Sequence, residues 1–267
     1  MSARLLQDKN AVIFGAGGSI GAAVAREFAA EGATVFLAGR TKASLEAVAR
    51  QITASGGESR TAVIDTLDDA SVNRYIEGIL KQAGGIDIVL DAAGPLAREY
   101  GNGKNAVDLP IEEFMVPLET MVRSRFITAR AAARHMIKRH SGVIIFVTGS
   151  PARGHVPGAT AIGAAFGAIE NLTENLALEV GPFGVRVVCL RTLANTDSRS
   201  ILDTTGFLAG QLKITRDQAM AHIAQSSFLK VSATVQDTAN AAVLIASDRA
   251  RMLTGTVMNA TAGAALD

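Results

Sequence analysis

The feature that most constrains this chain is a glycine-rich turn near its start. Residues 11–14 form a short apolar run, four glycines follow within residues 15–21, and apolar residues then recur at positions 20, 24 and 28. This order predicts a buried strand, a tight turn and an amphipathic helix. Glycine allows sharp turns and close approach of a ligand, and free N–H groups at a helix start favour negative charge. Similar turns also occur where nothing binds. We expect phosphate groups to bind at Gly15, Gly17, Gly18, Ser19, Ile20 and Gly21.

The rest of the chain continues this alternation of apolar runs and helical spacing. The runs are nearly continuous in apolar residues, as in a parallel sheet covered by helices on both faces. Helical spacing extends over 111–139, 158–180 and 235–247. With right-handed crossovers these elements predict an α/β fold, in which a doubly wound, mostly parallel, seven-stranded Rossmann-like sheet binds its ligand at the carboxyl ends of the strands. The predicted strands are residues 11–14, 33–38, 61–65, 86–90, 142–147, 185–190 and 256–259.

Length and composition indicate one domain. The 267 residues are 48% hydrophobic and 19% charged, enough to bury a full core in a single α/β unit spanning residues 1–267. A polar stretch at about 195–230 has no readable pattern. We expect it to be an irregular insertion that forms a lid over the substrate.

The charge pattern favours a small molecule over nucleic acid or a membrane as partner. The formal net charge is +1, and no basic stripe alternates with aromatic residues. The first residues lack the apolar core of a signal peptide and no apolar run suits a bilayer span, which predicts a cytoplasmic protein. The single cysteine, Cys189, lies in an apolar run where burial is expected, so neither a disulfide framework nor a metal site is predicted.

The residues after the second and third predicted strands bear on which nucleotide binds. A dinucleotide site carries an acid after the second strand for a free ribose 2′-hydroxyl, or a base for a 2′-phosphate. Here no acid is present, and Arg40 offers a planar fork suited to phosphate. This favours NADP as the cofactor, with NAD as the alternative, although Arg40 also fits a solvated basic loop. Asp65, after the third strand, either binds the adenine amino group or caps the next turn.

Several motifs, in this order and spacing, resemble those of the short-chain dehydrogenase/reductase family. The turn over 15–21 is similar to the family's Thr-Gly-x-x-x-Gly-Ile-Gly, with Phe14 and Ser19 as departures. Residues 90–94, Leu-Asp-Ala-Ala-Gly, resemble its Val-Asn-Asn-Ala-Gly, and 246–255 resemble its C-terminal signature. The resemblance implies the family's fold, a nicotinamide cofactor and assembly into a homo-dimer or homo-tetramer. It adds further cofactor-binding residues, namely Asp65, Ala92, Ala93 and Gly94.

The resemblance also implies a catalytic serine, a tyrosine, a lysine four residues after the tyrosine, and an asparagine on the preceding helix. In such a set the tyrosine exchanges a proton with the substrate oxygen, and the lysine lowers the tyrosine pKa. Aligning on residues 172–179 places Ile162 and Phe166 at the tyrosine and lysine positions, and aligning on Ser150 shifts both by one residue onto glycines. Met121 stands at the asparagine position. Ser150 alone remains of the set, and it also fits a turn or helix cap.

Other residues are candidates for the proton-transfer role. His155 lies five residues beyond Ser150, in a loop expected to face the nicotinamide. We therefore predict Ser150 and His155 as catalytic residues. Tyr100 with Lys104, in the loop after the fourth strand, is a further candidate, and Arg191 points either into the cleft or into solvent. Each of these residues is also consistent with an ordinary surface position that has no role in catalysis.

Three functions are open on these residues. The first is an NADP-dependent oxidoreductase that acts on a carbonyl or alcohol substrate with a replaced or substrate-supplied proton donor. The second is a catalytically silent protein whose bound cofactor has a structural, sensing or assembly role. The third is a non-redox isomerase or cyclase in the same pocket, because a fold does not determine a function.

Overall fold

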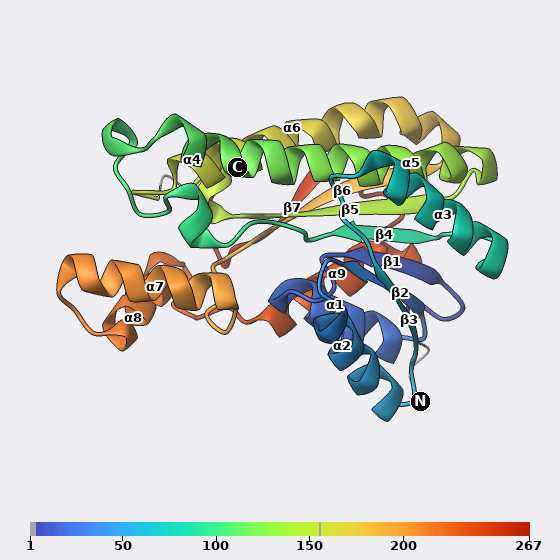
Figure 1. Cartoon of the computed structure of the whole chain (residues 1–267), viewed down its shortest axis with the longest axis horizontal. Coiled ribbons are helices and arrows are strands. Elements are labelled where there is room, and N and C mark those ends of the chain that lie inside the picture. Colours follow the sequence, from blue (N-terminus) through green and yellow to red (C-terminus); the bar gives the residue numbers. More distant parts are fainter. Residues whose placement is uncertain (1–3, 155) are drawn as a thin grey trace.

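Seven parallel strands form the central sheet of the computed structural model, which describes residues 4–154 and 156–267, without the side chains at 207, 208 and 210–212. The strands lie in the order β3-β2-β1-β4-β5-β6-β7. This confirms the predicted doubly wound sheet, and Figure 1 shows its twisted arrangement. The strands are β1 (Asn10–Phe14), β2 (Thr34–Gly39), β3 (Glu58–Val63), β4 (Ile88–Asp91), β5 (Gly142–Gly149), β6 (Val185–Thr192) and β7 (Thr256–Ala260).

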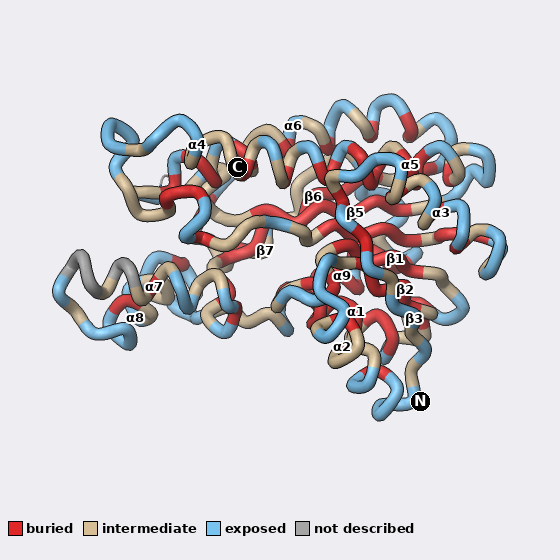
Figure 2. Tube along the Cα trace, in the orientation of Figure 1, coloured by how far each residue is buried: buried red, intermediate tan, exposed pale blue. Residues whose placement is uncertain are grey.

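Helices cover both faces of the sheet (Figure 1). Along β1, Val12 and Phe14 enter one apolar core while Ala11 and Ile13 enter the other, because successive side chains of a strand point to opposite faces. The first core contains residues of α3 (Asp69–Ala83), α5 (Arg123–Arg139) and α6 (Thr160–Val180). The second contains residues of α1 (Ser19–Ala30), α2 (Lys42–Ala54) and α9 (Val235–Ala246). Figure 2 shows mostly buried strands between helices whose residues alternate between buried and exposed.

The helix expected over 111–139 is interrupted. It consists of α4 (Ile111–Pro117), a π-helical turn over Leu118–Val122, and α5. Pro117 lies inside this stretch and has no N–H to donate, which breaks the regular hydrogen-bond ladder. The periodicity predicted one helix because a π-turn changes the register without ending the apolar face.

The insertion at 195–230 is helical, so its prediction as an irregular segment is wrong. It contains α7 (Arg199–Leu212) and α8 (Arg216–Ser226), which lie apart from the sheet in Figure 1. Both helices have side-chain caps at their N-termini. Ser198 accepts a hydrogen bond from the Ile201 N–H, and Thr215 forms a capping box with Gln218. These caps are the sequence signal that the polar composition obscured. No helix in the described part of the chain is long and apolar enough to cross a bilayer.

Candidate active site

The turns that follow the first five strands meet at one edge of the sheet, because all the strands run in the same direction. The chain leaves β1 for β2 on one side and returns to β4 on the other, so the strand order reverses between β1 and β4. Open sheets bind their ligands in the crevice at such a reversal. The predicted cofactor residues follow β1, β2, β3 and β4 at this edge.

The glycine-rich turn is closely packed and leaves backbone donors free. A Cβ on Gly21 would lie 2.3 Å from the Gly15 carbonyl oxygen, and a Cβ on Gly15, whose φ is +77°, would lie 2.6 Å from the Ala93 nitrogen. Within the described residues, the N–H groups of Gly17, Ser19, Ile20 and Gly21 have no acceptor. Four unpaired donors at the start of α1 fit an anionic diphosphate.

The residues beyond β2 and β3 are open to solvent. Arg40 is exposed, and it has no ion pair or hydrogen bond within the described residues. Its neighbour Lys42 pairs with Glu46 at 3.6 Å. Asp65 is also exposed, and its side chain accepts a hydrogen bond of 3.0 Å from the Leu67 N–H. The capping role foreseen for Asp65 is therefore present, while its second oxygen stays available.

Two further segments border the crevice. Ala92 and Ala93 are half-buried and Gly94 is exposed after β4, with the Met121 side chain 3.4 Å from where a Cβ on Gly94 would lie. The N-terminus of α7 also reaches the turn, because the Arg199 N–H donates a hydrogen bond of 3.1 Å to the Ser19 hydroxyl.

Ser150 follows β5 at the same edge. It is half-buried and begins a short 3₁₀ turn, in which its carbonyl accepts hydrogen bonds from the Arg153 and Gly154 N–H groups. His155, the other predicted catalytic residue, lies outside the described residues.

The chain is similar in sequence to a family of enzymes along almost its whole length. A family profile described as "Enoyl-(Acyl carrier protein) reductase" matches residues 15–265. The chain is 29% identical over 257 residues to the short-chain reductase protein NovJ of Streptomyces niveus, covering 96% of this chain and 94% of that protein. It is 32% identical over 187 residues to gluconate 5-dehydrogenase of Gluconobacter oxydans, covering 68% and 69% of the two chains.

The chain belongs to the short-chain dehydrogenase/reductase family. Among solved structures, sorbitol-6-phosphate 2-dehydrogenase SrlD from Erwinia amylovora superposes with a TM-score of 0.88 at 24% identity, over 96% of this chain and 100% of that one. The agreement in fold extends over the insertion as well as the sheet. Members of this short-chain dehydrogenase/reductase family bind NAD or NADP and act on small molecules.

Ile162 and Phe166 take the tyrosine and lysine positions only in the alignment on residues 172–179, and both lie on the first turns of α6. Ile162 belongs to the core beneath the helix, and Phe166 is half-buried. A Cβ on Gly149 would lie 3.0 Å from the Phe166 ring, so this ring occupies the space beside the end of β5. A Cβ on Gly163 would lie 2.9 Å from the Pro151 carbonyl oxygen, which shows that α6 and the Ser150 turn are in close contact.

Tyr100 and Lys104 do not form a tyrosine–lysine pair. Burial raises the pKa of Tyr100 to about 12, against the opposing effect of a hydrogen bond with Ser200. Lys104 instead forms an ion pair of 2.7 Å with Glu113. Tyr100 therefore remains a neutral phenol against α7, and among the residues that the structure describes no cation favours its ionised form.

Two buried ion pairs are site features that the sequence did not predict. Arg191 points into neither cleft nor solvent: it is 1% exposed and donates two hydrogen bonds of 2.8 Å to Glu170. Arg125, also 1% exposed, lies 3.9 Å from Asp91 beneath the turn after β4. Asp91 and Arg191 each follow an apolar run, which is a signal in the sequence, whereas Arg125 lies in an arginine-rich helix and gives none.

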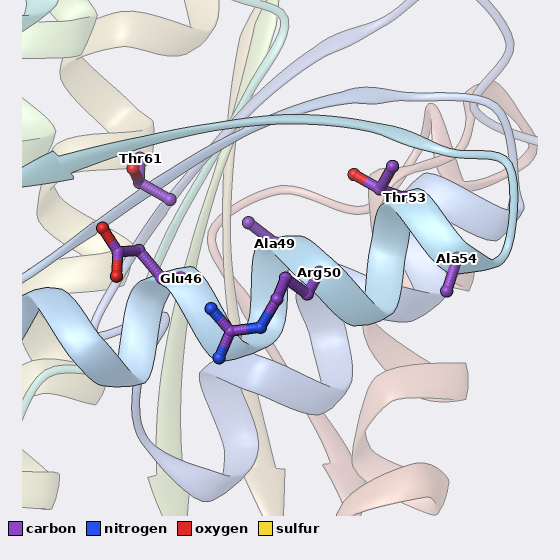
Figure 3. A pocket seen from close by; sticks show the side chains of 6 residues that line it. All are labelled: Glu46, Ala49, Arg50, Thr53, Ala54 and Thr61. Carbon is purple, nitrogen blue, oxygen red and sulfur yellow. The ribbon is translucent and has the colours of Figure 1, made fainter.

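A surface hollow lies away from these residues. Figure 3 shows it beside α2 and β3, along the outer edge of the sheet, with a volume of about 490 Å³. None of the predicted site residues lines it. The hollow is lined by Glu46, Ala49, Arg50, Thr53, Ala54 and Thr61.

Proposed function

We propose that this chain is an oxidoreductase that binds NADP in preference to NAD and acts on a small carbonyl or alcohol substrate with a non-standard proton donor. The observation that carries the proposal is the turn after β1, where four backbone donors without acceptors face a crevice at the strand reversal. The free guanidinium of Arg40 beyond β2 favours a 2′-phosphate over a bare hydroxyl.

Each part of the cofactor has residues suited to it. Gly17, Ser19, Ile20 and Gly21 would hold the diphosphate, Arg40 the 2′-phosphate and Asp65 the adenine. The backbone of Ala92, Ala93 and Gly94 would border the nicotinamide half. When bound, the nicotinamide supplies or accepts the hydride. The chain itself has to position the substrate oxygen and move a proton to or from it.

The proton step falls to Ser150 and His155 in this proposal. Ser150 follows β5 at the edge of the crevice and would orient the substrate oxygen, and His155 would exchange the proton. Tyr100 is unsuited, because a phenol with a pKa of about 12 and no adjacent cation transfers a proton poorly near neutral pH.

A catalytically silent cofactor-binding protein is the second candidate. One observation favours it: Ile162 and Phe166 place apolar side chains where the family's proton-transfer pair is expected. General acid–base catalysis contributes about 10²- to 10⁴-fold to a rate, so its loss would leave little turnover. Isomerase or cyclase activity in the same pocket is a third alternative, and no contact among the described residues favours it.

Assembly into a homo-dimer or homo-tetramer is part of the proposal. Phe126 on α5 and Leu178 on α6 are 48% and 78% exposed, although both belong to helices that pack on the same face of the sheet. A second copy of the chain would cover such side chains.

Binding and single-turnover measurements test the two functions together. Calorimetry with NADPH and NADH should show tighter binding of NADPH, and stopped-flow absorbance should show NADPH oxidation with at least one member of a carbonyl panel. Absence of binding would reject both candidates. Tight binding with no turnover across the panel would leave the silent protein.

Arg40→Ala provides the sharper test of cofactor choice. We expect it to weaken NADPH binding by about tenfold, because it removes a charge-assisted hydrogen bond to phosphate, and to leave NADH binding unchanged. Arg50→Ala is the matched control, since Arg50 is an exposed arginine of α2 that lines the outer hollow. An equal loss for NADPH and NADH would contradict the proposed role of Arg40.

A further inference from the structure

A buried ion pair holds the turn that follows β4. Asp91 is 0% exposed and ends β4, and Arg125 is 1% exposed and lies on α5, with 3.9 Å between the Arg125 Nη1 and Asp91 Oδ1 atoms. The Asp91 carboxylate also accepts hydrogen bonds of 2.7 Å from the Ser124 hydroxyl and 3.0 Å from the Thr128 hydroxyl. The pair is therefore anchored to α5 at several points.

Both polar atoms of one residue, Ala93, are bound by this pair. The Ala93 N–H donates a hydrogen bond of 2.8 Å to Asp91 Oδ1, and the Ala93 carbonyl accepts one from Arg125 Nη1. The same Nη1 group lies 3.4 Å from the Met121 carbonyl, in the π-helical turn where the ladder is broken. Arg125 thus joins the turn after β4 to the interrupted start of α5.

Ala93 in turn touches the phosphate turn. A Cβ on Gly15 would lie 2.6 Å from the Ala93 nitrogen and 2.9 Å from its Cα. The two walls of the crevice, one after β1 and one after β4, are therefore in van der Waals contact at Gly15 and Ala93. A shift of the Ala93 backbone toward β1 would therefore press directly on Gly15.

Stability alone does not account for this pair. Replacement of a buried ion pair by apolar residues of similar size is often neutral or stabilising, because the attraction between the two charges often fails to repay their desolvation. Arg125 also leaves its Nε atom buried without a partner within the described residues, a further cost. What apolar side chains cannot do is hold the N–H and C=O groups of Ala93 in one orientation.

We propose that Asp91 and Arg125 are positioning residues that fix the backbone of Ala93 and thereby the part of the crevice that takes the nicotinamide half of the dinucleotide. The inference rests on the proposed function. The assignment of Ala93 to the nicotinamide half follows from topology. β1, β2 and β3 lie on the adenosine side of the strand reversal, and β4 begins the other side.

Two ligands separate this role from general destabilisation. Calorimetry on the full chain with NADPH probes both halves of the crevice, and 2′,5′-ADP probes only the adenosine side. For Arg125→Met we expect NADPH binding to weaken about tenfold or more and 2′,5′-ADP binding to stay within about twofold. Arg125→Lys, which keeps the charge and one donor direction, should recover part of the NADPH affinity.

Arg125→Met alone leaves the Asp91 charge buried without a cation and could unfold the chain for that reason. A double variant without either charge avoids this problem. In Asp91→Asn with Arg125→Met no charge is stranded, so the chain should fold while the Ala93 carbonyl loses its charged donor. It should show the same selective loss for NADPH. Arg130→Met is the matched control, because Arg130 lies on α5 and pairs with Asp69 at 2.7 Å on the surface.

The outcomes separate the positioning role of the pair from the proposed function of the chain. Unchanged NADPH affinity in both Arg125→Met variants, or an equal loss of NADPH and 2′,5′-ADP, overturns the positioning role while the proposed function stands. A wild-type chain that binds neither ligand rejects the proposed function and this inference together.

Discussion

At the scale of single residues, the chain keeps its charges in the core only where each has a partner. Glu170 is 2% exposed on α6 and binds Arg191 of β6 through two hydrogen bonds. Thr148 adds a third hydrogen bond to the same carboxylate at 3.2 Å. Such a pair contributes little net stability, but removal of one member leaves the other charge buried.

Glu170→Ala should therefore be strongly destabilising. We expect a loss of about 3 kcal/mol in the free energy of unfolding, measured by urea denaturation, because the Arg191 guanidinium loses its buried partner. The double variant Glu170→Leu with Arg191→Leu should recover most of that loss. A single variant that unfolds like the wild type would show that Asp267, the other partner of Arg191, is sufficient.

At the scale of elements, helix starts are specified by different means along the chain. Asp68 precedes α3 and accepts a hydrogen bond of 3.0 Å from the Ser71 N–H. Thr41 precedes α2, but its side chain makes no capping hydrogen bond. Asp68 and Thr41 are both residue types that favour the N-cap, but only Asp68 makes the capping hydrogen bond. The sequence pattern alone does not distinguish these two cases.

This difference gives a matched pair of variants. Asp68→Ala should cost about 1 kcal/mol of unfolding free energy, because it removes a hydrogen bond to an otherwise unpaired helix N–H. Thr41→Ala should change the free energy of unfolding by less than about 0.5 kcal/mol. Urea denaturation of both proteins decides between them, and equal losses would refute the capping geometry.

At the scale of the whole molecule, residues 261–267 connect parts that are distant in sequence. The Phe228 and Leu229 N–H groups, just after the end of α8, donate hydrogen bonds to the Ala262 carbonyl, which follows β7. Ala265 approaches the Ser150 turn, since a Cβ on Gly154 would lie 3.5 Å from its Cβ. Asp267 is bound to Arg191. This segment therefore ties the insertion, the turn after β5 and the buried ion pair together.

Asp267→Asn should loosen the base of the insertion. The hydrogen bond from Arg191 holds the pKa of Asp267 below its ordinary value, so its contribution is present at neutral pH and is lost as acidification protonates it. We expect faster tryptic cleavage after the exposed Lys230 at pH 7.5 in the variant. Asp248→Asn, which alters an exposed pair with Lys9, is the control. Identical cleavage rates for all three proteins would contradict the link.

The local pattern predicted the sheet well and the insertion poorly. Buried strands such as β1 and β5 have long apolar runs, and helices such as α1 have apolar residues at helical spacing, so both are visible in the sequence. β3 is an edge strand in which every residue is exposed or half-buried, and it begins before the apolar run at 61–65. In the insertion, composition obscured helices that depend on their caps.

For the site, the sequence by itself determined what a local backbone can decide. Three features of the site are properties of short segments. They are the glycines of the first turn, Arg40 after β2, and the absence of a tyrosine–lysine pair after β5. Only the tertiary structure decided which distant side chains meet: Arg125 with Asp91, Arg191 with Glu170, and Tyr100 with α7 rather than with Lys104. The physical reason is that the partner of a buried charge lies on whichever strand or helix packs next to it. The spacing of residues along the chain does not specify which strand or helix that is.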